Sequence, residues 1–287
     1  MAQAVAQTAW AAWLQIAILA GVLVLLYHTI IARLAAQWLT DSDSSYGFIV
    51  PFFSAWIIWS ARKRIAAAPV KPSWLGLVVV LCASGTLLLG AIGAENFLSR
   101  ISLLIFLAGL AIYFRGWRFF RTMLFPWAVL FLAIPLPTII LNQITLPLQF
   151  QASRLATGLI SLVGVPVLRQ GNLIILPSIT LEVVEACSGL RSLFSLITMA
   201  ALYGYFFEPR IWKRALLVAV AVPIAVAANA LRIAGSGILG QYWDPSKAQG
   251  FLHLFSGWLI FLVSLCLLFA FHRALSGMNR LLKPRSV

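Results

Sequence analysis

Eight apolar runs, each close to the length needed to cross a lipid bilayer, follow one another along this chain of 287 residues. A transmembrane helix needs about 20 mostly apolar residues. Inside a bilayer every backbone polar group must be bonded within the protein, so such runs fold as helices. We therefore predict an all-α polytopic membrane protein, a single domain over 1–287 with about eight transmembrane helices. The predicted helices cover 10–32, 46–61, 74–94, 97–114, 119–141, 188–207, 214–239 and 253–271.

The composition excludes a soluble fold. The chain is 62% hydrophobic and only 10% charged, which is too little polar surface for a soluble domain. Its net charge of +14 would suit a nucleic acid. The basic residues, however, cluster in the short gaps between apolar runs, which is the pattern of cytoplasmic loops. No nucleic-acid-binding motif is present, so we expect contacts with membrane lipids and no nucleic-acid partner.

Loop charge predicts the orientation. With the N-terminus inside and eight crossings, the inner segments hold 14 of the 21 basic residues, so both termini are predicted to be cytoplasmic. These 14 are Arg62, Lys63, Arg64, Lys71, Arg115, Arg118, Arg121, Arg210, Lys213, Arg214, Arg273, Arg280, Lys283 and Arg285. The first run has no basic leader, so we interpret it as a retained span. The second run is short and carries Pro51, and it could instead be re-entrant.

One long outer segment, residues 142–187, precedes the sixth predicted helix. Its first half, Gln143–Val163, mixes polar residues with leucines and predicts an amphipathic helix at the membrane surface. Its second half, Asn172–Val184, has two short β-rich pieces on either side of Pro177 and Ser178. This pattern predicts a small β-hairpin.

A cysteine, Cys187, stands directly before the sixth helix in the run Glu-Ala-Cys-Ser-Gly-Leu-Arg. A thiol at a helix N-terminus is biased towards the reactive thiolate. Ser188 is a suitable N-cap, and Gly189 allows another chain to approach the backbone closely. The alternative is an inert, packed cysteine, which is how we interpret Cys82 and Cys266 inside apolar runs.

Two ionisable residues in later apolar runs are predicted to lie at a similar depth. Arg232 must be paired or face a polar cavity, and an ion pair with Glu185 or Glu182 is the structural alternative. His253 opens the last run and could exchange a proton with a thiol, although a histidine at the interface is often structural. A cysteine, a histidine and a charge stabiliser are the elements of thiol acyl transfer. No metal-binding or phosphate-binding motif occurs, so we expect no metal and no cofactor.

At these residues the chain resembles the exosortase family, within the exosortase and archaeosortase group of membrane transpeptidases. The matching elements are Ala186–Ser192, Asn229–Ile233, and His253 followed by Gly257 and Trp258. The early segment Asp41–Gly47 is similar to the family's first outer loop. That loop more often has histidine where this chain has Tyr46, so we assign Tyr46 no catalytic role.

The resemblance implies a cysteine endopeptidase and transpeptidase of the bacterial inner membrane, with its active site on the periplasmic face. The implied substrates are exported proteins that end in a Pro-Glu-Pro motif, a transmembrane helix and a basic tail. The acyl group would pass to a cell-surface acceptor, in connection with exopolysaccharide. Cys187 would be the nucleophile, His253 the base and acid, and Arg232 the stabiliser of thiolate or oxyanion. Residues that could bind substrate or support the site are Glu185, Ser188, Gly189, Arg191 and Asn229.

A non-catalytic membrane subunit or transporter in surface-polysaccharide export is the alternative. Transporters place polar groups near the membrane midplane and often contain inverted repeats. We find neither pattern in this sequence. Retained function after loss of Cys187 would favour the non-catalytic alternative.

Overall fold

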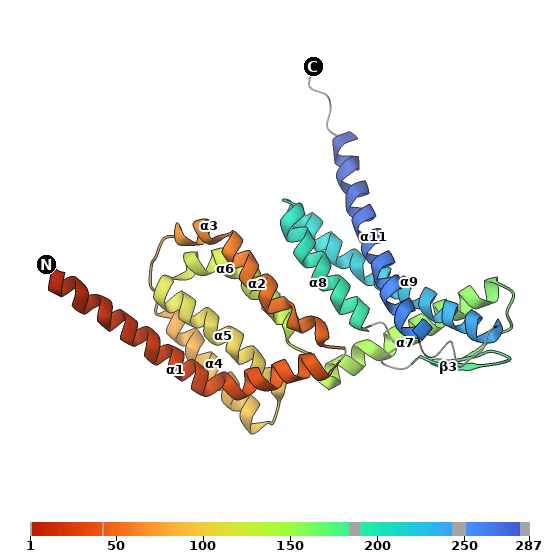
Figure 1. Ribbon diagram of the computed structural model, residues 1–287, viewed down its shortest axis with the longest axis horizontal. Helices are drawn as coiled ribbons and strands as arrows, with labels where there is room; N and C mark the ends of the chain where they lie inside the picture. The colour runs from red at the N-terminus through yellow and green to blue at the C-terminus, as the bar shows by residue number, and fades with distance from the viewer. Residues whose placement is uncertain (1, 42, 184–189, 243–250, 282–287) are drawn as a thin grey trace, which may run out of the picture. The chain divides into compact units, whose positions relative to one another are not determined.

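The structure is a computed structural model that describes residues 2–41, 43–183, 190–242 and 251–281 (Figure 1). The chain divides into two compact units, Met1–Pro137 and Thr138–Val287. The prediction of one membrane domain over 1–287 stays a prediction. The expected fold class, an all-α polytopic membrane protein, is confirmed.

The described part of the first unit contains only helices as regular elements. They are α1 (Ala2–Thr40), η1 (Ser45–Phe48), α2 (Val50–Ser60), α3 (Arg62–Ala66), α4 (Leu75–Ile92), α5 (Asn96–Arg115), α6 (Trp117–Val129) and η2 (Leu130–Ala133).

Helices α4 and α5 form a tight pair in the first unit (Figure 1). Glu95 caps α5 by accepting the backbone N–H groups two and three residues later, at 2.9 and 3.1 Å. The helix ends at Gly116, whose φ of +89° suits glycine. Glycine also sets the spacing of the pair, because a Cβ on Gly76 would overlap the backbone of Tyr113. Small residues of this kind let membrane helices approach closely.

Five described helices are long and apolar enough to span a membrane, or six if Trp117–Ala133 and Thr138–Leu162 together form one span. The five are Ala17–Thr40, Leu75–Ile92, Asn96–Arg115, Ile211–Tyr242 and Gly257–Ser276. The predicted number of eight is therefore not confirmed. These helices cover most of five predicted runs, so periodicity and length located them well.

Three predicted runs are not among these five helices, and two of the three are interrupted. The predicted span 46–61 becomes the short helix pair η1 and α2, with Pro51 in the first turn of α2. The predicted span 119–141 ends as a helix at Ala133, before the sequence Ile-Pro-Leu-Pro at 134–137. At the second break Ile134, which precedes Pro135, is extended, because proline lacks an N–H group and disfavours helical geometry in the residue before it. The length of an apolar run does not by itself predict where the helix is interrupted.

The second unit contains the long helices that carry the candidate residues. Its elements are α7 (Thr138–Leu162), β1 (Leu168–Gln170), β2 (Leu173–Ile175), β3 (Thr180–Glu182), α8 (Leu190–Phe207), α9 (Ile211–Tyr242) and α11 (Phe251–Leu281). The predicted helix 188–207 is present as α8, and the predicted outer helix is present as α7.

The predicted hairpin is confirmed and gains a third strand. β2 and β3 pair antiparallel, with Ile175 opposite Thr180, so the chain turns at 176–179. β1 pairs antiparallel with β2 on its other edge. The sheet is packed through the buried Ile174 against α7 and against Ile233 of α9. The sequence did not indicate β1 because its residues, Leu-Arg-Gln, are exposed and largely polar.

Three helices, α8, α9 and α11, pack against one another around a second buried core (Figure 1). This core consists of Leu193, Leu196, Ala200, Leu217, Ala221, Ala225 and Leu268. α8 and α9 are joined by the three residues 208–210, so they run antiparallel. The three-helix core is the scaffold for the candidate site.

Candidate active site

Arg232 lies on α9, ten residues before the helix ends at Tyr242. Its side chain is half-buried, and its Nη2 atom is fully buried. Asn229, one turn earlier, is only 2% exposed, and its Oδ1 atom is also buried. The next residues, Ile233 and Ala234, are packed in the core against α7 and the sheet. The backbone that carries Arg232 is therefore held by apolar packing, as a precisely oriented guanidinium requires.

Helix α11 passes directly beside this guanidinium. A Cβ placed on Gly257 would lie 3.6 Å from the Nη1 atom of Arg232. The absence of a side chain at Gly257 therefore leaves room for the charged group. In a helix, residues four apart lie on the same face, so position 253 is one turn before Gly257 on that face. Position 253 is also in the first turn of α11, which begins at Phe251. The structure thus brings Arg232 next to the turn that carries His253, while the side chain of His253 lies outside the described residues.

The predicted nucleophile and three neighbours lie outside the described residues as well. They are Cys187, Glu185, Ser188 and Gly189. The chain on both sides is well anchored. Before them, Val183 is 1% exposed, and its N–H donates to the carbonyl of Asn172 at 3.0 Å. After them, α8 begins at Leu190, and Leu193 is buried in the three-helix core. Arg191 is exposed in the first turn of α8.

The lengths of the helices place Arg232 at the same end of the unit as the start of α8. From the loop 208–210, α8 extends back over about 26 Å to Leu190, at 1.5 Å per residue. On the same scale α9 extends over about 31 Å from Ile211 to Arg232. α9 therefore reaches Arg232 about one turn beyond the level of Leu190, at the end where the chain enters α8.

The interpretation of the other two cysteines as packed core residues is wrong. Cys82 on α4 and Cys266 on α11 are both exposed on the surfaces of their helices. A helix face that meets lipid is as apolar as one that meets protein, so composition does not distinguish the two. Both thiols lie within candidate membrane spans, on surfaces suited to face lipid.

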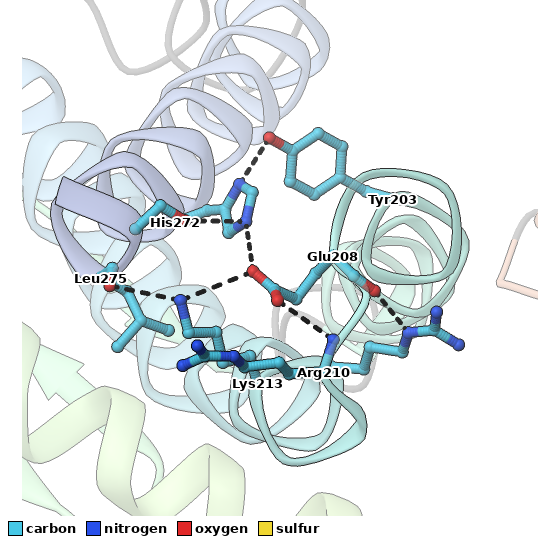
Figure 2. Close-up of polar contacts among 8 residues, drawn as sticks. Tyr203, Glu208, Arg210, Lys213, His272 and Leu275 are labelled. Carbon is cyan, nitrogen blue, oxygen red and sulfur yellow. Dashed lines mark hydrogen bonds and ion pairs between the residues drawn. The ribbon is translucent and has the colours of Figure 1, made fainter. Parts of the chain in front are cut away.

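A second polar cluster, which the sequence analysis did not predict, lies at the opposite end of the same three helices (Figure 2). Glu208, in the loop after α8, is 5% exposed and contacts His272 of α11 and Lys213 of α9. Burial alone would raise the pKa of Glu208. The backbone N–H of Arg210, together with His272 and Lys213, outweighs burial and holds the pKa below its usual value. One sequence signal could have identified it, because Glu208 is the one acidic residue predicted on the inner side.

The family model for transmembrane exosortases, Exosortase_EpsH, matches residues 38–270, most of the chain. This chain belongs to the exosortase family. No curated protein and no solved structure matches it. The matched region of this exosortase includes Arg232, Gly257, Glu208 and Lys213, and it also covers positions 187 and 253. His272 lies just after its end.

Proposed function

We propose that this exosortase is a cysteine transpeptidase that cleaves a C-terminal sorting signal from exported proteins. The observation that carries the proposal is the contact between Arg232 and α11 at Gly257. It brings a half-buried cationic group to within one turn of position 253, at the end of the unit where the chain enters α8 three residues after Cys187. Family membership supports the class of the enzyme, and these contacts support the assignment of roles.

In the proposed reaction the thiolate of Cys187 attacks the carbonyl carbon of the scissile peptide bond. His253 accepts the thiol proton and then delivers it to the leaving amine as the C–N bond breaks. Arg232 donates N–H groups to the oxyanion of the tetrahedral intermediate, which a buried guanidinium stabilises strongly. The product is a thioester on Cys187 and a released C-terminal fragment. An amine or hydroxyl of the acceptor, or water, then attacks the thioester and regenerates the thiol.

The proposed substrates are exported proteins with a Pro-Glu-Pro motif, a transmembrane helix and a basic tail, and the proposed acceptor lies at the cell surface. We propose that the site faces the periplasm and that both termini are cytoplasmic, because the inner segments hold 14 of 21 basic residues. Asn229 is proposed to support Arg232 from the preceding turn. Arg191, exposed in the first turn of α8, is proposed to contact the substrate.

Replacement of each cysteine tests the proposal. Cys187→Ala is expected to abolish processing of a sorting-signal substrate, with the variant still inserted in the membrane at the wild-type level. The controls Cys82→Ala and Cys266→Ala are expected to process normally. With Cys187 as the only thiol, a membrane-impermeant maleimide should label the protein in intact spheroplasts. Normal processing by the Cys187→Ala variant would refute the enzyme proposal and favour a non-catalytic subunit.

A further inference from the structure

Glu208 forms the centre of a buried polar cluster that joins three helices (Figure 2). Its Oε2 atom lies 3.3 Å from Nε2 of His272 and 3.6 Å from Nζ of Lys213. Its Oε1 atom accepts the backbone N–H of Arg210 at 3.1 Å. The carboxylate is thus held by the start of α9 and by α11 at once.

Further bonds in this cluster also cross between helices. The hydroxyl of Tyr203, on α8, lies 2.8 Å from Nδ1 of His272. Nζ of Lys213 donates to the carbonyl oxygen of Leu275, on α11, at 3.4 Å. Each of α8, α9 and α11 therefore contributes at least one side chain. These bonds link α11 to α8 and to α9, and Glu208, in the loop between α8 and α9, contacts both α9 and α11. We call Tyr203, Glu208, Lys213 and His272 the Glu208 cluster.

The burial of the Glu208 cluster indicates a role beyond stability. Lys213 is 3% exposed and His272 is 8% exposed. Two charges removed from water lose several kcal/mol of hydration each, and apolar residues of similar volume often stabilise a protein equally well. An ion pair adds directional geometry, because its hydrogen bonds form only when the helices stand at one axial position relative to one another. A buried charged cluster is best attested where a register must be specified.

The register at this end is transmitted to the candidate site. Lys213 and Arg232 are nineteen positions apart on α9, and His253 and His272 are nineteen positions apart on α11. Between the two ends the helices are close-packed through fully buried residues such as Leu217, Ala221 and Leu268. Such a core transmits a shift instead of absorbing it. A slip of α11 by one residue would move the 253–257 turn past Arg232 by about 1.5 Å.

We propose that the Glu208 cluster fixes the axial register of α8, α9 and α11, and so positions Arg232 against the 253–257 turn. The consequence for catalysis rests on the function proposed above, whereas the register itself does not. The members of the cluster are positioning residues. At 1.5 Å per residue, they lie about 28 Å along the helices from the reacting groups. They touch no substrate in this proposal.

The register can be measured without any activity. Leu231 on α9 and Trp258 on α11 are exposed and adjacent in sequence to Arg232 and Gly257. Spin labels are attached at Leu231→Cys and Trp258→Cys in a protein whose three native cysteines are replaced. Electron–electron resonance should give a narrow distance distribution in this parent protein. Glu208→Gln should broaden or shift that distribution, whereas Arg273→Gln, an exposed charge next to His272, should leave it unchanged.

A double variant separates positioning from stability. Glu208→Gln leaves Lys213 buried beside an uncharged partner, which destabilises the fold. Glu208→Gln with Lys213→Met removes both charges, so unfolding in detergent should return towards the wild-type temperature. If the cluster positions the helices, the label distances in this double variant stay broad. In the active protein kcat falls about ten- to a hundredfold while KM is unchanged. Tyr203→Phe, which removes only the hydroxyl beside His272, should give the same change in milder form.

A wild-type distance distribution in the double variant would overturn the proposal, because the cluster would then act on stability alone. The same conclusion would follow if Tyr203→Phe and Glu208→Gln both kept the parent distribution. Because these distances are measured without Cys187, a failure of the cysteine experiment would remove the enzyme proposal and leave the register result intact.

Discussion

Substitution of Gly257 tests the contact on which the candidate site depends. A Cβ at this position would lie 3.6 Å from Nη1 of Arg232, an ordinary van der Waals distance. Gly257→Ala should therefore fit without moving the guanidinium. Glycine inside a helix is less favourable than alanine by up to about 1 kcal/mol, so the variant should be as stable as the wild type or slightly more stable. Processing of the substrate should stay near the wild-type rate.

Gly257→Leu should have the opposite effect. Leucine adds three carbons beyond Cβ, and the space next to Cβ is already occupied by Arg232. Overpacking of this kind destabilises by about 1–3 kcal/mol. A displacement of the guanidinium by about 1 Å is enough to slow the reaction about a hundredfold. The loss should appear in kcat, because Arg232 is proposed to act on the transition state.

The assay compares thermal unfolding in detergent with kcat and KM for cleavage of a sorting-signal peptide. Gly235→Leu is the matched control, since this glycine is three residues after Arg232 and a Cβ there would meet no atom within 4 Å among the described residues. It should keep both stability and activity. A Gly257→Leu enzyme with the wild-type kcat would refute the placement of Arg232 beside α11 as a catalytic arrangement.

Two further predictions concern the fold. Gly116→Ala should destabilise the protein by at least about 2 kcal/mol, because φ is +89° and a Cβ would overlap the carbonyl of Lys71. Thermal unfolding measures this loss. Gly85→Ala is the neutral control, because a Cβ there meets no described atom within 4 Å. The pKa of Glu208, facing His272, Lys213 and the N–H of Arg210, is lowered by folding, so its contribution is complete above the unfolded-state pKa. That contribution should be lost as the pH falls below about 4.3, and Glu208→Gln should remove this part of the acid dependence in a pH series of unfolding temperatures.

The class of the protein and the positions of most of its helices follow from local sequence patterns. Apolar runs of bilayer length have few alternatives to helix, because unpaired backbone groups are too costly in lipid. This is why 74–94 and 97–114 correspond to α4 and α5 within a few residues. The two short β-rich pieces on either side of Pro177 and Ser178 likewise predicted the pairing of β2 with β3. The motif around position 187, together with Asn229–Ile233 and the segment from His253 to Trp258, indicated the exosortase family, which the family model confirms.

Which of these elements contact one another depends on how the helices pack. No local pattern in the sequence relates Gly257 to Arg232, because they are 25 positions apart and their contact depends on how α9 and α11 pack. The Glu208 cluster was missed for the same reason. Glu208, Lys213 and His272 each look like an ordinary charge near the end of an apolar run, and their burial exists only once three helices have packed around them. Residue types and helix lengths are local properties that one chain segment can specify. A shared register of three helices is a property of their packed interface, which only the folded structure reveals.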